Sequence, residues 1–412
     1  MNRLVRWLLP LIALLLVAVG ALFVFAPKDV AVPEDADLSI KLENLPDDQN
    51  AWKALIEGAK NLTLGGIEPR GFFAENAFIP SAADQLMSGN KVALQALERA
   101  SRLTQARSPA SSPDVTVFSE YNVRSFEANL LGARQLAELG LVRAEVSWRS
   151  GQSADAWRDL MMVARLGSVL RGAKGTLLEQ VVADTITRLA LERLRIALPL
   201  LKFSGSEWRT KFAELEAIPV GREPYVNALR LNYRIAKMAI QAETAKPGSV
   251  VKQSGNPLQF LRLLLPRAYN FQANRSLAWL ADHTRASIID VRSCPPGLSS
   301  EASSKQLGQE INAPNANVIG QAILVRSTEN TQSDITEQCA LELSKSAALI
   351  SSGIQAFKTQ FDSLPSKLED LRTIGLPVIP VDPYAPGGKT FQFDAKAATL
   401  RSESGLLIQV GK

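Results

Sequence analysis

The apolar positions of this chain form an uninterrupted run at the start, helical stripes in the middle and short alternating segments near the end. The run extends from Trp7 to Ala26 without a charged side chain. Twenty helical residues rise about 30 Å, the thickness of a bilayer core. Arg3 and Arg6 precede the run and an acidic stretch follows it, so the positive-inside rule places the N-terminus in the cytoplasm. We therefore predict a cytoplasmic stub and transmembrane anchor over residues 1–27.

A cleaved signal peptide is the competing interpretation of this run. The apolar region of a signal peptide usually spans about 7–15 residues, and this run is longer. Pro27 would follow a cut after Ala26 directly, which disfavours that site, and Ala18-Val19-Gly20 offers a weaker one. Both interpretations place the rest of the chain outside the cytoplasm.

Helical stripes dominate residues 51–292, after a polar, proline-containing linker over 28–50. Stripes over 130–148 and 154–170 are separated by Gly151-Gln152-Ser153, which predicts two helices joined by a short turn. Part of this stretch resembles one tetratricopeptide hairpin, but a solenoid needs several copies and we find one. Residues 293–332 are rich in serine, glycine, proline and asparagine, and we predict a loop-rich connector there.

The last eighty or so residues, 333–412, change character. Apolar positions step by three and four along one predicted helix of about 27 residues, at Ile335, Cys339, Leu343, Ala347, Ile350, Ile354, Phe357 and Phe361. Short segments at 390–393, 399–402 and 406–410 then predict small strands. The expected fold class is mainly α, with an N-terminal transmembrane helix, an extracytoplasmic helical-hairpin domain and a small α+β C-terminal module.

This C-terminal order resembles the tail of type II secretion pseudopilins over about 70 residues. The matching positions are Phe361, Leu364, Pro365, Leu368, Leu371, Pro380, Asp382, Pro383, Tyr384 and Gly388. The N-terminus lacks the prepilin-processing segment, so the resemblance does not extend to assembly of a pilus. The layout as a whole is similar to uncharacterised bacterial single-pass membrane proteins with such a tail. That resemblance implies a protein of the bacterial inner membrane with its bulk in the periplasm, and no known activity.

Composition supports a folded protein rather than a disordered one. The chain has 412 residues, 46% of them hydrophobic, and a net charge of only +5 with basic and acidic residues interleaved. This pattern does not indicate a basic surface that binds nucleic acid. The two cysteines, Cys294 and Cys339, would form a disulfide in an oxidising compartment. Two separate buried thiols are the alternative.

Few residues of the sequence suggest a catalytic or metal-binding site. His283 is the only histidine and the two cysteines are distant in sequence, which argues against a metal site. Carboxylates recur at helical spacing, as in Asp155 with Asp159 and Glu138 with Glu145. Such pairs are typical of solvated helix faces, although two acids would suffice for glycoside hydrolysis.

Three short motifs occur in the order found in penicillin-binding enzymes. They are Ser88-Gly89-Asn90-Lys91, Ser254-Gly255-Asn256 and Lys389-Thr390-Phe391, and the third lacks its glycine. Gly387-Gly388-Lys389-Thr390 also hints at a phosphate loop, but Pro383 stands where that motif needs glycine.

We therefore expect a membrane-anchored scaffold or interaction protein of the bacterial envelope that catalyses no step. Its expected partners are the membrane and other envelope proteins, with no nucleic acid, cofactor or metal. The alternative is a cell-wall-active hydrolase or serine acyltransferase.

Overall fold

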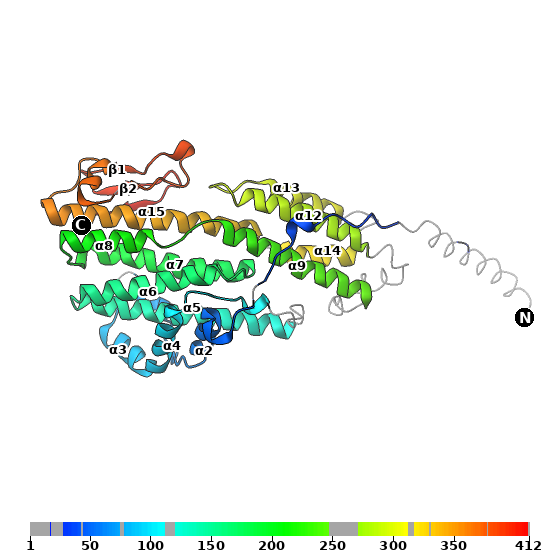
Figure 1. Ribbon diagram of the computed structural model, residues 1–412, viewed down its shortest axis with the longest axis horizontal. Helices are drawn as coiled ribbons and strands as arrows, with labels where there is room; N and C mark the ends of the chain where they lie inside the picture. Colours follow the sequence, from blue (N-terminus) through cyan, green and yellow to red (C-terminus); the bar gives the residue numbers. More distant parts are fainter. Residues whose placement is uncertain are drawn as a thin grey trace, which may run out of the picture. The chain divides into compact units, whose positions relative to one another are not determined.

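The protein is mainly helical, with a small three-stranded sheet near the C-terminus (Figure 1). The computed structural model describes residues 17, 28–42, 44–74, 78–111, 120–246, 271–311, 317–328, 331–376 and 378–410. The predicted anchor from Trp7 to Ala26 lies outside these residues except for Val17. Across the described ranges, no helix combines the length and the apolar character needed to cross a membrane.

Contacts divide the chain into two units, each discontinuous in sequence. Unit 1 comprises Met1–Ile40, Asn232–Ile289 and Leu298–Thr331. Unit 2 comprises Lys41–Leu231, Asp290–Gly297 and Gln332–Lys412. The ranges 51–292, 293–332 and 333–412 remain predictions, and neither unit coincides with one of them.

Unit 2 is built around three consecutive long helices, α5 (Glu120–Arg149), α6 (Ser153–Arg171) and α7 (Leu177–Ala197). The turn between α5 and α6 uses Gly151 at a φ of 76°, as the break in the apolar stripe predicts. Thr176 caps α7 by accepting a hydrogen bond from the backbone of Glu179, whose side chain bonds back to Thr176. The shorter helices of this unit are α2 (Ala51–Ala59), α3 (Pro80–Gly89), α4 (Lys91–Arg102) and α8 (Gly205–Glu216).

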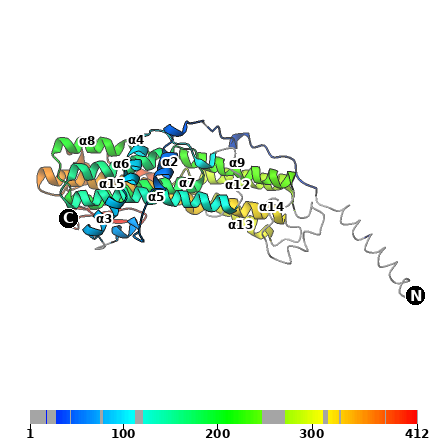
Figure 2. The ribbon, with the colours of Figure 1, turned by 90° about the horizontal axis from the view of Figure 1, so that it is seen from below.

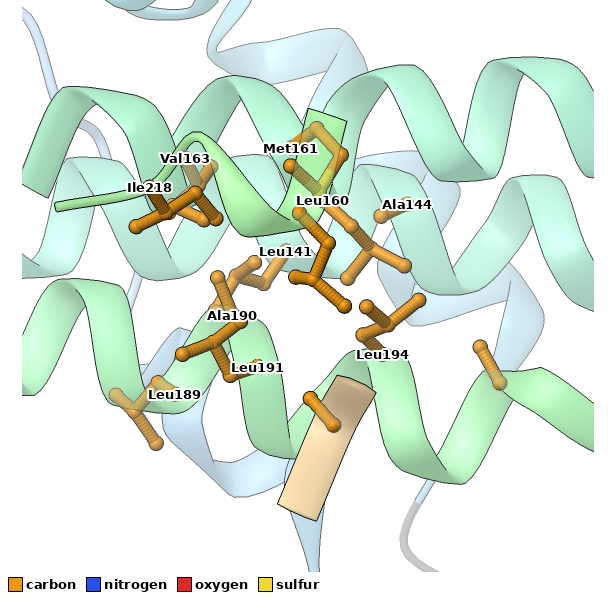
Figure 3. Close-up of a cluster of buried hydrophobic side chains, with 14 of the residues drawn as sticks. Leu141, Ala144, Leu160, Met161, Val163, Leu189, Ala190, Leu191, Leu194 and Ile218 are labelled. Carbon is orange, nitrogen blue, oxygen red and sulfur yellow. The ribbon is translucent and has the colours of Figure 1, made fainter. Parts of the chain in front are cut away.

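The core of unit 2 lies between these helices. Figure 3 shows Leu141 of α5, Leu160 of α6 and Leu191 of α7 converging with their neighbours. Helices α6 and α7 approach closely at Gly167, where an added Cβ would lie 2.3 Å from Oγ1 of Thr187. The helix pair is therefore fixed by close backbone packing as well as by apolar burial.

The predicted C-terminal helix and strands are confirmed. Helix α15 (Thr331–Phe361) is followed by two 3₁₀ segments, η6 (Leu368–Ile374) and η7 (Pro386–Gly388). An antiparallel sheet then has the order β1 (Gln392–Asp394), β2 (Thr399–Arg401) and β3 (Leu407–Gln409). Its register pairs Phe393 with Leu400 and Leu400 with Ile408, so one face of the sheet carries the apolar side chains.

Unit 1 contains the later part of α9 (Glu223–Ala245) together with α12 (Ala273–Asp290), α13 (Ser299–Ile311) and α14 (Val318–Thr328) (Figure 2). Helices α13 and α14 show that the loop prediction for 293–332 was wrong over most of its length. Serine costs only a few tenths of a kcal/mol in a helix. The serines of α13 therefore do not prevent a helix, and α14, which contains one serine, buries Ile319, Ile323 and Leu324.

Candidate functional site: an acidic strap on unit 1

Residues 29–38, called the strap below, immediately follow the apolar N-terminal segment and contact α9 and α12 within unit 1. The sequence predicts this stretch as part of a polar linker. In the structure three of its aspartates are bonded to helical residues more than 190 positions away in the chain. The strap also buries Leu38, whose exposed fraction is 1%.

Asp29 caps the N-terminus of α12. Its carboxylate oxygens accept hydrogen bonds from the backbone N–H of Asn274 at 2.9 Å and of Arg275 at 3.0 Å. The Asn274 amide donates to the carbonyl of Val30 at 2.8 Å. The first N–H groups of a helix lack intrahelical partners, and a carboxylate there is favoured by the helix dipole. Asp29 therefore supplies the cap from a distant segment.

Asp35 bonds to two side chains of α9. Its carboxylate accepts hydrogen bonds from the Tyr233 hydroxyl and from Nζ of Lys237. The bonds from Lys237 and Tyr233 hold the pKa of Asp35 below its ordinary value. Burial and the neighbouring Asp35 raise the pKa of Tyr233. At neutral pH Asp35 therefore stays ionised and Tyr233 stays protonated, as the hydrogen bond between them requires.

Asp37 forms a two-point ion pair with Arg285 of α12. Nε of Arg285 lies 3.0 Å and Nη2 2.8 Å from the two oxygens of Asp37. The same Nη2 donates to the carbonyl of Glu34 at 2.7 Å, and Nη1 lies 3.2 Å from Asp282. The planar guanidinium suits such bidentate contact. Arg285 thus fixes both the backbone and a side chain of the strap.

A cavity of about 390 Å³ lies between the strap and α9. Its lining includes Ser39, Arg234, Lys237 and Gln241. A serine nucleophile would need a neutral lysine as its base. Here Lys237 is ion-paired with Asp35, so it is not placed to activate Ser39.

A second polar cluster lies in the core of unit 2. Arg171, with 2% of its side chain exposed, forms an ion pair with the buried Asp184. Its other nitrogens donate to Oε1 of Gln338 at 2.6 Å and to two backbone carbonyls, at 3.1 and 3.0 Å. Burial raises the pKa of Asp184 to about 6, opposed by the charge of Arg171. Burial also raises the pKa of the adjacent Tyr225 well above its ordinary value. The contacts of Arg171 join α6, α7 and α15 through polar bonds.

The two cysteines form a disulfide within unit 2, with an S–S distance of 2.06 Å. Beside it, Nε and Nη2 of Arg222 lie 2.8 Å from the two carboxylate oxygens of Glu342. Arg222 also donates to the carbonyl of Arg292, and its Nη2 lies 3.4 Å from Sγ of Cys294. The disulfide and these contacts of Arg222 together join the start of α9, the 290–297 segment and α15.

The serine motifs do not assemble a nucleophile among the described residues. The Ser88 hydroxyl donates to the carbonyl of Gln85 at 2.9 Å, within its own helix. The Asn90 side chain is buried and bonds twice to the backbone of Thr63. Lys91 is exposed, and Ser254-Gly255-Asn256 lies outside the described residues. These contacts explain the first motif as local structure.

The remaining candidates are structural as well. His283 is buried and stacks on Trp279, with ring centroids 4.9 Å apart. The Gly387-Gly388 segment forms a 3₁₀ turn, and strand β1 rather than a helix follows it. Within the described ranges, no cluster of three or more potential metal ligands occurs.

The helically spaced carboxylates turn out to be mostly buried, contrary to a solvated-face interpretation. Glu145 pairs with Arg193 of α7. Asp159 of α6 accepts two bonds from Arg143 of α5, at 2.8 and 3.1 Å. Burial raises the pKa of Glu138, whose partner is Arg134. Asp155 alone is only half-buried, with 46% of its side chain exposed. Glu145 and Asp159 therefore join helices to one another.

Comparison with protein-family models, with curated proteins and with solved structures finds no match to this chain.

Proposed function

We propose that the protein is a membrane-anchored extracytoplasmic scaffold of the bacterial envelope that catalyses no step. In this proposal the segment Trp7 to Ala26 spans the inner membrane once, with the N-terminus in the cytoplasm and the bulk of the chain in the periplasm. The observation that carries it is the strap. A tether that only retains a protein at the membrane needs no fixed contact with the domain, whereas this one is bonded through Asp29, Asp35 and Asp37. Such a connection suits a protein that holds partners at a set place.

Two further observations support the location and the lack of catalysis. The disulfide between Cys294 and Cys339 is a bond typical of oxidising compartments such as the periplasm. The buried Asp184 and the buried Glu145 are each engaged by an arginine, as a packing role requires.

The C-terminal module is the part we propose to be pseudopilin-like. Its order of long helix, 3₁₀ turn and small antiparallel sheet supports the resemblance. Asp382 within it is buried and accepts backbone bonds from Tyr384 at 3.0 Å and Glu403 at 2.7 Å. This carboxylate holds the turn before the sheet, so we propose that the module serves as a stable contact surface for another envelope protein.

The test combines topology with partner capture. The full chain, tagged at its C-terminus, is expressed in a Gram-negative host, and its membranes are washed with alkaline carbonate. We expect the chain to stay in the membrane and its tag to be digested by protease added to spheroplasts. Cross-linking and affinity purification should then recover the same envelope protein in independent preparations. Release by carbonate or protection of the tag would overturn the proposed anchor. The same preparation releasing cell-wall fragments from sacculi would overturn the non-catalytic role.

A further inference from the structure

We infer that the end of unit 1 at which α12 begins rests against the phospholipid headgroups of the periplasmic leaflet. This inference rests on the proposed function, because it takes the segment ending at Ala26 as the membrane span. It adds an interaction surface that an anchor alone does not imply, since an anchor with a free linker would leave unit 1 unoriented.

Only a short length of chain separates the end of the proposed membrane span from α12. Asp29 lies three residues beyond Ala26, and three residues span at most about 11 Å. The Asp29 carboxylate reaches the amides of Asn274 and Arg275 at 2.9 and 3.0 Å. Each headgroup layer is about 5–8 Å thick. The first turn of α12 is therefore held in the headgroup layer or within about 10 Å of it.

Basic and acidic side chains are distributed unevenly along the strap and α12. Lys28 and Arg275 are exposed at this end and flank Asp29. The acids Glu34 and Asp37, by contrast, lie further along the strap, where Asp37 meets Arg285. From Asn274 to Arg285 a helix rises about 16 Å, more than a Debye length at physiological salt.

An anionic leaflet attracts each nearby lysine or arginine by about 1 kcal/mol and repels carboxylates. The basic end of α12 is therefore favoured at the lipid surface and the acidic part of the strap away from it. Helix α12 accordingly rises from the membrane, with Ile289 about 24 Å further along the helix than Ala273.

The experiment measures the depth of the two ends of α12 in reconstituted protein. Because Cys294 and Cys339 are joined in a disulfide, one introduced cysteine can be labelled selectively. The variants Ala273→Cys and Ile289→Cys carry an environment-sensitive fluorophore at opposite ends of the helix, and Ile289 is already exposed. Val30→Cys is a second proximal position in case a label at 273 disturbs the first helical turn, because the Val30 side chain is exposed and only its backbone bonds to Asn274. The full chain is placed in vesicles of phosphatidylethanolamine and phosphatidylglycerol that contain a headgroup spin label.

We expect quenching at 273 or 30 to exceed quenching at 289 at least threefold, and Asp29→Asn to reduce the difference. Equal quenching at both ends, or stronger quenching at 289, in protein that floats with the vesicles would overturn the inference and leave the proposed anchor intact. Protein that does not float with the vesicles would overturn the anchor, and the inference with it.

Discussion

Removal of the Cys294–Cys339 disulfide should lower the free energy of unfolding by an amount that follows from the length of the loop that the bond closes. The two residues are separated by 45 positions, so the bond closes a loop of that length in the unfolded state. The chain-entropy expression gives a loss of about 13 cal/mol/K for such a loop, or about 4 kcal/mol at 25 °C. The double variant Cys294→Ser/Cys339→Ser should therefore destabilise unit 2 by about 2–4 kcal/mol. The contacts between Arg222 and Glu342 remain in that variant and limit local loosening.

Urea unfolding of the full chain in detergent micelles, followed by tryptophan fluorescence, measures this change. Hydrogen exchange then locates it. We expect faster exchange in peptides covering 290–297 and the first turns of α15, and unchanged exchange in the sheet at 392–410. Adding a reductant to the wild-type protein should reproduce the effect, and adding it to the double variant should change nothing. A free energy of unfolding within about 0.5 kcal/mol of wild type in the double variant would refute the loop-closure reasoning.

Three further predictions concern the strap, the buried cluster and the helix core. Asp37→Asn should weaken the contact with Arg285 by about 0.5–1.5 kcal/mol, because a partly exposed charge-assisted pair is lost, and hydrogen exchange of residues 29–40 should rise. Asp184 has a folded pKa raised to about 6, so its native state holds a proton to higher pH than the unfolded chain. The contribution of Asp184 to stability should fall by about 3 kcal/mol as pH rises from 4 to 6 and then level off, and urea titrations measure it as the pH-dependent difference between the wild type and Asp184→Asn. Gly167→Ala should cost about 1–3 kcal/mol in thermal or urea unfolding, because its Cβ would meet Thr187, while Gly89→Ala, in open space, should cost nothing. An unaltered exchange rate, a flat pH profile or equal glycine variants would each contradict the corresponding prediction.

The helices of unit 2 and the C-terminal sheet are predictable because their signals are local. The apolar stripes over 130–148 and 154–170, separated by Gly151, mark the end of α5 and both ends of α6 within one or two residues. The alternating segments near residues 392, 400 and 408 likewise become β1 to β3. The loop prediction for 293–332 is wrong because serine opposes a helix only weakly in α13, and because α14 is mostly apolar and buries Ile319, Ile323 and Leu324.

The candidate site was not predictable to the same degree because its contacts are distant in sequence. The acids of the strap are visible in the sequence, but their partners Tyr233, Lys237 and Arg285 follow about 200–250 residues later. Sequence spacing likewise makes Asp155 and Asp159 look equivalent. Only the structure shows that Asp159 is buried against Arg143, whereas Asp155 is half-buried. The one usable signal was the cluster of aspartates directly after the apolar run, which charge patterning attributes to a solvated linker.

The strap sets the length of chain that is free between the proposed anchor and the folded protein. With Asp29 bonded to α12, about three residues lie between Ala26 and the first fixed contact. If all three aspartate contacts open, the free segment extends to Ile40, where unit 1 ends in this part of the chain, and fourteen residues can span up to about 50 Å. The contacts of Asp35 and Asp37 are partly exposed ion pairs, and the contact of Asp29 is that of a carboxylate with a helix N-terminus, so high salt weakens all three, whereas the disulfide between Cys294 and Cys339 is covalent. Raising the ionic strength should therefore lengthen the tether well before unit 2 unfolds, and the strap would then set how far the folded protein reaches from the proposed anchor.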